Sequence, residues 1–274
     1  MKLTKEQRFL YNRIAIIAAT AGWLSFMYAG FQGFGYWYGG FIVCLWLSFG
    51  LVNLPHKSSV ALLLRQPHLF FLLYAAAAAT FYLGDRVGLQ HFLWTYPQYD
   101  SWGFAWLYLV LYPVMGLALI ELIYFVGSRL DAPFSFHSLP DSRNHRFVDA
   151  AESILFLIMM GLIVFAAAEP APLPLLAAVT VVWIVSALVK LRLHIGHAGH
   201  FSAALLLAVV LATMLSEYPN LTAREWVYLP ATALDPSLQA PLFGLPVWLW
   251  LGWFWLALVP LRLWIFLVLH PKVK

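Results

Sequence analysis

Charged side chains are scarce in this chain. Asp, Glu, Lys and Arg together make up 10% of its 274 residues, whereas 63% of the residues are hydrophobic. The mean hydropathy is +0.80. A soluble domain of this length could not remove so much apolar surface from water. The composition therefore excludes an ordinary soluble protein and predicts an integral membrane protein.

Cysteine and the common catalytic motifs are also scarce or missing. The single cysteine, Cys44, excludes an intrachain disulfide and a C-x-x-C pair. The sequence has no G-x-S-x-G nucleophile elbow, no phosphate-binding glycine loop and no H-E-x-x-H zinc motif. These absences exclude the enzyme classes that depend on such motifs, and the cofactor, if there is one, stays unknown at this stage.

Long apolar stretches dominate the sequence. A helix needs about 20 mostly apolar residues to cross the hydrocarbon core of a membrane. The predicted fold is therefore an all-α, polytopic membrane helical bundle with eight transmembrane helices. These are Phe9–Ala29, Tyr36–Leu54, Val60–Leu83, Trp102–Val126, Ala150–Ala168, Leu173–Leu191, Phe201–Leu215 and Val247–Leu269.

Lys and Arg are distributed unevenly between these stretches. With the N-terminus inside, thirteen of the sixteen lie at the inner side, and only Arg86 and Arg224 lie in outer loops. Basic residues concentrate on the cytoplasmic side of membrane proteins. The pattern predicts a multi-pass protein of the cell membrane with cytoplasmic N- and C-termini. The net charge of +4 follows from this orientation and requires no nucleic acid as a partner.

The sequence predicts two halves of four spans each, although the aromatic residues that the halves share are also common at membrane interfaces in general. Residues 1–127 form a first four-helix half, residues 128–149 a cytoplasmic linker loop, and residues 150–274 a second four-helix half. Trp94-Thr95-Tyr96 precedes the fourth span, and Trp226-Val227-Tyr228 precedes the eighth. Because each half has an even number of spans, these signals predict a 4+4 internal repeat of the parallel kind.

The tryptophans and tyrosines of the two long outer loops allow two interpretations. Trp94, Tyr96, Trp226 and Tyr228 are typical of an aromatic belt at the membrane surface. They also suit an aromatic-lined mouth that binds a hydrophobic ligand, and we take these four residues as ligand-binding candidates.

Ionisable residues inside the spans are expensive, at about 2.5–3.5 kcal/mol each near the bilayer centre, and so mark function or pairing. Glu121 and Arg262 lie at similar depth in the fourth and eighth spans. We predict that they face each other or a shared polar cavity, either as a structural ion pair or as a site in which Arg262 contacts the ligand. Glu121 is one catalytic candidate, and Glu152, one turn inside the fifth span, is the other.

Three histidines follow one another at intervals of three residues: His194, His197 and His200. Imidazole is a common iron ligand, so a histidine-ligated metal site is one interpretation of this cluster. Solvated histidines at the inner membrane surface are the other, because the chain lacks the H-x-x-x-H and H-x-x-H-H boxes of membrane di-iron enzymes.

The second outer loop resembles a known family. Trp226-Val227-Tyr228, then Leu234-Asp235-Pro236, Pro241-Leu242-Phe243-Gly244-Leu245-Pro246-Val247-Trp248 and Gly252-Trp253 resemble the Y-x-Y…L-x-P…F-G-x-P…W run of carotenoid-hydratase-like membrane proteins. Leu93-Trp94-Thr95-Tyr96-Pro97 followed by Glu121 is similar to a pattern of lycopene-cyclase-type domains, although one carboxylate stands where that family has two. The resemblance implies acid–base chemistry on a C=C bond of an isoprenoid, with Glu121 and Glu152 as the acids.

Three functional hypotheses follow. The first is a membrane protein that binds or acts on a hydrophobic, carotenoid-like isoprenoid. The second is a non-catalytic pigment-, quinone- or lipid-binding subunit of a larger membrane complex, and the third is a histidine-ligated membrane oxidoreductase. The predicted partners are membrane lipid and a hydrophobic small molecule. A homo-oligomer or a partner within a membrane complex is left open.

Overall fold

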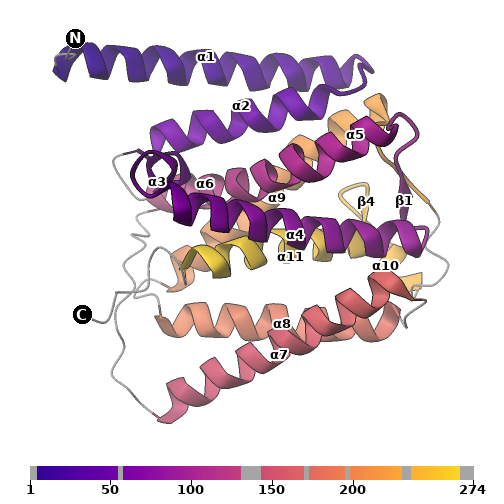
Figure 1. Ribbon diagram of the computed structural model, residues 1–274. Coiled ribbons are helices and arrows are strands. Elements are labelled where there is room, and N and C mark those ends of the chain that lie inside the picture. Colours follow the sequence, from indigo (N-terminus) through magenta and orange to yellow (C-terminus); the bar gives the residue numbers. More distant parts are fainter. Residues whose placement is uncertain are drawn as a thin grey trace.

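The computed structural model describes residues 5–54, 58–130, 143–169, 173–194, 198–229 and 236–265. These residues are mostly helical, and the long helices lie side by side along one common direction (Figure 1). Among the described residues, seven helical segments are long and apolar enough to cross a membrane, and α2 is a shorter apolar helix. The chain is thus a multi-pass integral membrane protein.

The helices follow the predicted apolar stretches. In chain order the first half contains α1 (Lys5–Phe31), α2 (Trp37–Val52), α3 (Ser59–Arg65), α4 (Pro67–Gln90), β1 (Trp94–Thr95), α5 (Ser101–Trp106), a π-helical turn η1 (Leu107–Leu111) and α6 (Tyr112–Arg129). The second half contains α7 (Arg143–Ala168), α8 (Leu173–His194), α9 (Ala198–Ala223), β2 (Val227–Tyr228), α10 (Pro236–Gln239), β3 (Pro241–Leu242), β4 (Leu245–Pro246) and α11 (Val247–Trp264).

Two prolines shape the helices of the first half. The third predicted span, Val60–Leu83, breaks at Gln66 because Pro67 disfavours helical backbone in the residue before it and instead begins α4. Pro113 has no N–H and cannot bond the carbonyl of Leu109, four residues earlier. Here the helix forms the π-helical turn η1, and the Tyr74 hydroxyl donates to the Leu109 oxygen at 2.6 Å. The Leu109 carbonyl therefore keeps a hydrogen-bond donor in spite of Pro113.

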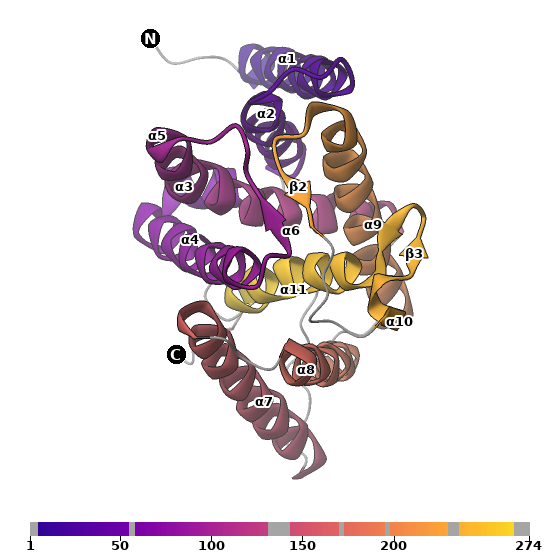
Figure 2. The same ribbon diagram turned by 90° about the vertical axis from the view of Figure 1, so that its right-hand side faces the viewer.

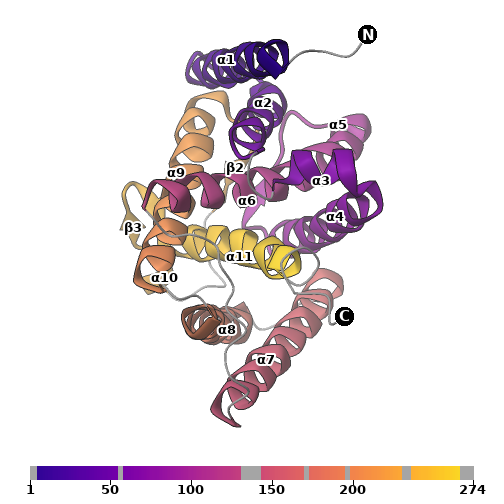
Figure 3. The same ribbon diagram turned by 90° about the vertical axis from the view of Figure 1, so that its left-hand side faces the viewer.

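The long helices of the two halves pack around a common centre. Seen along the helices, α6 and α11 lie side by side at the centre, with α1 and α2 above, α7 and α8 below, and α4 and α9 on either side (Figures 2 and 3). The helix α4 contacts α6, α7 and α11, and α9 contacts α6, α1, α8 and α11. The central position of α6 explains why almost all of its side chains are buried.

The bundle has two distinct ends. α1 begins and α11 ends at the same end of the bundle, at the left of Figure 1, where α3 also lies. β1, β4 and α10 lie at the other end, together with β2, which pairs with β1. We call this second end the ribbon end, after the β1–β2 pair.

Candidate functional site

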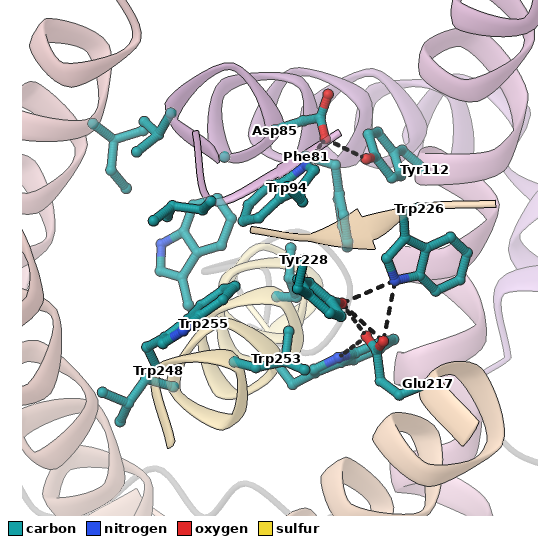
Figure 4. A pocket seen from close by; sticks show the side chains of 18 of the residues that line it. Phe81, Asp85, Trp94, Tyr112, Glu217, Trp226, Tyr228, Trp248, Trp253 and Trp255 are labelled. Carbon is teal, nitrogen blue, oxygen red and sulfur yellow. Dashed lines mark hydrogen bonds between the residues drawn. The ribbon is translucent and has the colours of Figure 1, made fainter. Parts of the chain in front are cut away.

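A cavity of about 250 Å³ lies at the ribbon end. Most of its wall is apolar and comes from α4, α6, α8 and α11, and the two strands β1 and β2 pass over it (Figure 4). Gly252 of α11 lies in this wall, and a Cβ atom added there would meet no other atom within 4 Å. The backbone of α11 therefore has open space beside it at this residue.

The β1–β2 pair joins the two halves above the cavity. The strands are antiparallel, with Trp94 opposite Tyr228 and Thr95 opposite Val227. Each strand follows a long helix after one residue in the left-handed region, Phe92 with φ 53° and Arg224 with φ 54°. These two strained residues turn the chain back over the helix ends in the same way in both halves.

Asp85, near the end of α4, reaches the cavity wall, and its hydrogen-bond donors among the described residues are all aromatic side chains. Its Oδ1 accepts from the Trp94 indole N–H at 2.9 Å and from the hydroxyls of Tyr96 and Tyr112 at 2.5 and 2.7 Å. Its Oδ2 accepts from the Tyr108 hydroxyl at 2.6 Å. The hydroxyls of Tyr96 and Tyr112 also contact each other. Asp85 is thus buried with four neutral donors, and no described Lys or Arg forms an ion pair with it.

Glu217, near the end of α9, has a second set of aromatic partners. The indole N–H of Trp253 donates to Oε1 at 2.9 Å, and that of Trp226 donates to Oε2 at 3.1 Å. The Tyr228 hydroxyl lies 2.8 Å from both carboxyl oxygens. Glu217 is 2% exposed and lines the cavity. Within the described part of the chain it has no cationic partner either.

The two acids have the same sequence relationship to their partners. In each half a carboxylate is followed by Trp nine residues later and by Tyr eleven residues later, and both rings bond it: Trp94 and Tyr96 for Asp85, Trp226 and Tyr228 for Glu217. We call these two groups the acid–Trp–Tyr modules. They place two carboxyl groups at one cavity from opposite halves of the chain.

The two module tyrosines, Tyr96 and Tyr228, lie outside the spans and donate hydrogen bonds to the carboxylates. Burial, reinforced by the nearby Asp85 charge, raises the pKa of Tyr96 well above its ordinary value. Burial and then the nearby Glu217 charge do the same to the pKa of Tyr228. Both hydroxyls therefore keep their protons at neutral pH and can donate them in hydrogen bonds. The Trp248 ring packs between the modules. It is stacked on Trp94, with 6.0 Å between the ring centres, and lies edge-on to Tyr228, with 5.5 Å between the ring centres.

The four aromatic residues selected from the sequence, Trp94, Tyr96, Trp226 and Tyr228, all line this cavity. Each of the four bonds Asp85 or Glu217, and Figure 4 shows Trp94, Trp226 and Tyr228 around the cavity at the ribbon end. Their part in binding a ligand stays a prediction.

The predicted contact between Glu121 and Arg262 is wrong. Arg262 instead bonds Glu152, with its Nε 2.8 Å from Oε1, and its guanidinium lies 4.0 Å from the centre of the Phe156 ring. Lys190 also bonds Glu152, at 2.9 Å. The direction in which each side chain leaves its helix decides the partner: Arg262 meets Glu152, and Glu121 meets Asn53 and Ser59.

Glu121, in α6, lies against the start of α3 rather than against Arg262, and its hydrogen bonds connect these two helices. It accepts from the Asn53 amide at 2.7 Å, from the Ser59 hydroxyl at 2.6 Å and from the Ser59 backbone N–H. Because Ser59 is the first residue of α3, this carboxylate neutralises the donor end of that helix. Glu121 and Glu152 do not line the cavity at the ribbon end, so nothing in this geometry supports either of them as its acid.

The histidine cluster cannot be compared with the structure. His197 lies outside the described residues, and so do the side chains of His194 and His200. Among the side chains that the structure does describe, no group of three His, Cys, Asp or Glu residues is arranged to hold a metal ion. The metal site therefore stays a prediction.

Sequence reasoning missed Asp85 and Glu217 because both were assigned to outer loops. The structure instead includes them in α4 and α9. The spacing of acid, Trp and Tyr, repeated in the two halves, was the signal that could have identified them.

Comparison with known proteins gives no match: no protein-family model, no curated protein and no solved structure is significantly similar to this chain. The functional conclusion therefore rests on the geometry of the site.

Proposed function

We propose that this chain binds a hydrophobic isoprenoid-type lipid in the cavity at the ribbon end. The observation that carries the proposal is the cavity itself, which is about 250 Å³ in volume, mostly apolar and lined by aromatic rings from both halves. Such pockets suit ligands with long apolar bodies, and a few polar groups fix the orientation of the ligand. The resemblance of the segment around Trp226–Trp253 to carotenoid-hydratase-like proteins supports the isoprenoid class and acid–base chemistry on a C=C bond.

The proposed topology has eight spans in the cell membrane, with both ends of the chain in the cytoplasm and the ribbon end outside. Support comes from the sequence, in which thirteen of the sixteen Lys and Arg residues fall in the segments predicted to lie inside. The two acid–Trp–Tyr modules support a 4+4 parallel repeat. The cavity would then lie in the outer half of the membrane, where a lipid can reach it from the bilayer.

A second candidate function is a non-catalytic lipid- or pigment-binding subunit of a larger complex. The observation that favours it is α1, which is largely unburied within the chain and exposes apolar residues such as Ile17 and Tyr28. Lipid or a partner helix could cover this face. Cross-linking in the native membrane separates the two, because only the subunit hypothesis predicts a stable partner along α1.

The proposal is tested by gentle purification followed by extraction and mass spectrometry of the bound lipid. Gly252→Leu places a side chain in the open space of the cavity and should displace the lipid. Gly161→Leu is the matched control, because Gly161 of α7 also has nothing within 4 Å but does not line the cavity. Loss of an isoprenoid from Gly252→Leu alone supports the proposal. Equal lipid content in both variants, or no isoprenoid in the unmodified protein, contradicts it.

A further inference from the structure

The structure describes five carboxylates that are at least 97% buried, and three of them have a structural role. Glu152 pairs with Arg262 and Lys190. Glu121 bonds the first residue of α3, and Glu225 accepts the backbone N–H of Tyr38 in the first turn of α2. The other two, Asp85 and Glu217, bond only aromatic donors in the wall of the cavity. Buried acids without a counter-charge are costly and are typical of functional sites.

We infer that Asp85 and Glu217 are a proton-exchanging pair that shifts a double bond in the ligand. Glu217 donates a proton to one carbon of a C=C bond, and the carboxylate of Asp85 removes a proton from the carbon next to the other end of that bond. This inference rests on the proposed function, because it needs an unsaturated isoprenoid in the cavity. It assigns the acid–base role to residues other than Glu121 and Glu152.

The partners of Glu217 suit a proton donor. An indole N–H can only donate a hydrogen bond, so Trp226 and Trp253 cannot receive a proton from this carboxyl group. Only the hydroxyl of Tyr228 can both donate and accept. A proton on Glu217 therefore has two destinations, the Tyr228 oxygen and a molecule in the cavity.

The partners of Asp85 suit a proton acceptor. Three donors reach Oδ1 of Asp85, and only the Tyr108 hydroxyl reaches Oδ2. Because each carboxylate oxygen has about two acceptor positions, Oδ2 keeps one that can take a proton. The contact between the hydroxyls of Tyr96 and Tyr112 continues this network beyond the carboxylate. A proton taken from the ligand thus has a hydrogen-bonded route away from Asp85.

The two modules also bring the carboxyl groups of Asp85 and Glu217 to the same cavity, where one ligand can contact both. Asp85 comes from the first half and Glu217 from the second, and the paired strands β1 and β2 hold the Trp and Tyr residues of both modules over one cavity. Figure 4 shows Asp85 and Glu217 on different sides of β2, with Tyr228 and Trp226 close to Glu217. A ligand between them can meet one carboxyl group at each of two positions.

The step is balanced without another reactant. One C–H bond forms at the carbon that Glu217 protonates, one C–H bond breaks at the carbon that Asp85 deprotonates, and the double bond moves by one position. No carbon is oxidised or reduced overall. Glu217 then regains a proton and Asp85 releases one by exchange with water, so deuterium from heavy water would enter the ligand.

The experiment uses the full chain in phosphatidylcholine nanodiscs with squalene, a neutral unsaturated isoprenoid, in heavy water. Squalene retained by the protein is extracted and its deuterium content is measured by mass spectrometry. We expect deuterium to enter the squalene held by the unmodified protein. In Glu217→Gln and in Asp85→Asn the rate should fall about 100-fold or more, as for the loss of a general acid or base, while squalene retention persists.

Two further variants keep the test decisive if the amide variants unfold. Glu217→Asp keeps the carboxylic acid on a shorter side chain and should restore part of the exchange. Glu121→Gln changes a buried carboxylate outside the cavity and should exchange at the unmodified rate. Retained squalene without deuterium in the unmodified protein, or unchanged exchange in Glu217→Gln, overturns the inference and leaves the binding proposal intact. Failure of the unmodified protein to retain squalene counts against the proposed function and removes the basis of this inference.

Discussion

Trp94 lies opposite Tyr228 in the β1–β2 pair, although 134 residues of chain separate the two in sequence. Trp94 bonds Asp85 on its own half, and Tyr228 bonds Glu217 on the other. The short ribbon therefore connects the two buried carboxylates through their own hydrogen-bond donors. Any change that moves one of these rings should therefore alter the hydrogen bonds of both modules and the shape of the cavity beneath them.

The position of Trp94 depends on the absence of a side chain at Gly88. A Cβ atom added there would lie 2.0 Å from Cζ2 of the Trp94 ring. Gly88→Ala should therefore displace the ring and lower the free energy of unfolding by about 1–3 kcal/mol, as overpacking does. Bound lipid should fall as well. Thermal unfolding and lipid extraction measure the two effects.

Gly252→Ala is the matched control for this prediction, because the added methyl group enters open space. The same substitution there should leave thermal stability unchanged or raise it slightly, since Ala is the better helix former. Equal melting temperatures for Gly88→Ala and Gly252→Ala would show that Trp94 is not held as described.

The ion pairs of Glu152 should stabilise the packing of α7 against α8 and α11. Glu152→Ala removes the partner of Arg262 and Lys190. We expect a loss of about 1.5–3 kcal/mol, typical of hydrogen bonds to charged groups, and a lower melting temperature in detergent. Asp149→Asn is the control: Asp149 is 40% exposed and lies 3.5 Å from Lys190, and surface pairs contribute about 0–1 kcal/mol. A larger effect at Asp149 than at Glu152 would contradict this account.

Glu225 should make stability depend on pH. Burial raises its pKa above the ordinary value of 4.5, although hydrogen bonds from the Tyr38 backbone and the Tyr99 hydroxyl lower it in part. Between 4.5 and the raised value, the folded protein binds more protons at this site than the unfolded chain does. The contribution of Glu225 to the free energy of unfolding is therefore fully present at low pH, and it decreases as the pH rises through that window.

Glu225→Gln keeps an acceptor for the Tyr38 N–H and removes the titration. Relative to this variant, the unmodified protein should lose melting temperature as the pH rises from about 4.5. Melting curves of both proteins over a pH series measure the difference. A difference that stays constant across the series would show that Glu225 does not titrate differently in the folded state.

The proposed sidedness can be tested with single cysteines, because Cys44 is the sole native cysteine and can be replaced by Ser. Phe92→Cys and Phe243→Cys are exposed at the ribbon end and should react with a membrane-impermeant maleimide in intact cells. Gln66→Cys and Ser128→Cys, exposed at the opposite end, should react only after permeabilisation. The reverse pattern would place the ribbon end in the cytoplasm.

Hydropathy and charge predicted the helices well, because length and apolar character are properties of each segment alone. Each of the eight predicted spans overlaps helix within the described residues, although the third is divided between α3 and α4 at Gln66. The ends are less accurate. The seventh span was expected to end at Leu215, whereas α9 continues to Ala223 through Pro219. Glu217 was therefore assigned to a loop. Its aromatic hydrogen-bond donors allow a carboxylate within the helix at this position.

Side-chain partners could not be read from the sequence in the same way. Arg262 and Glu121 were placed at equal depth, but pairing depends on how each helix is rotated and on which neighbour it packs against. Arg262 faces α7 and meets Glu152. The four aromatic residues were easier to identify. The loops that the sequence assigns to the membrane surface are the same loops that line the cavity.

An experimental structure of the full chain in lipid nanodiscs tests the central claim most directly. We predict elongated density in the cavity at the ribbon end, in contact with the rings of Trp94 and Trp226 and between Asp85 and Glu217. The same structure of Gly252→Leu should lack that density. A cavity closed by side chains or filled with water in the unmodified protein, with lipid only on the outer helix faces, would contradict the account.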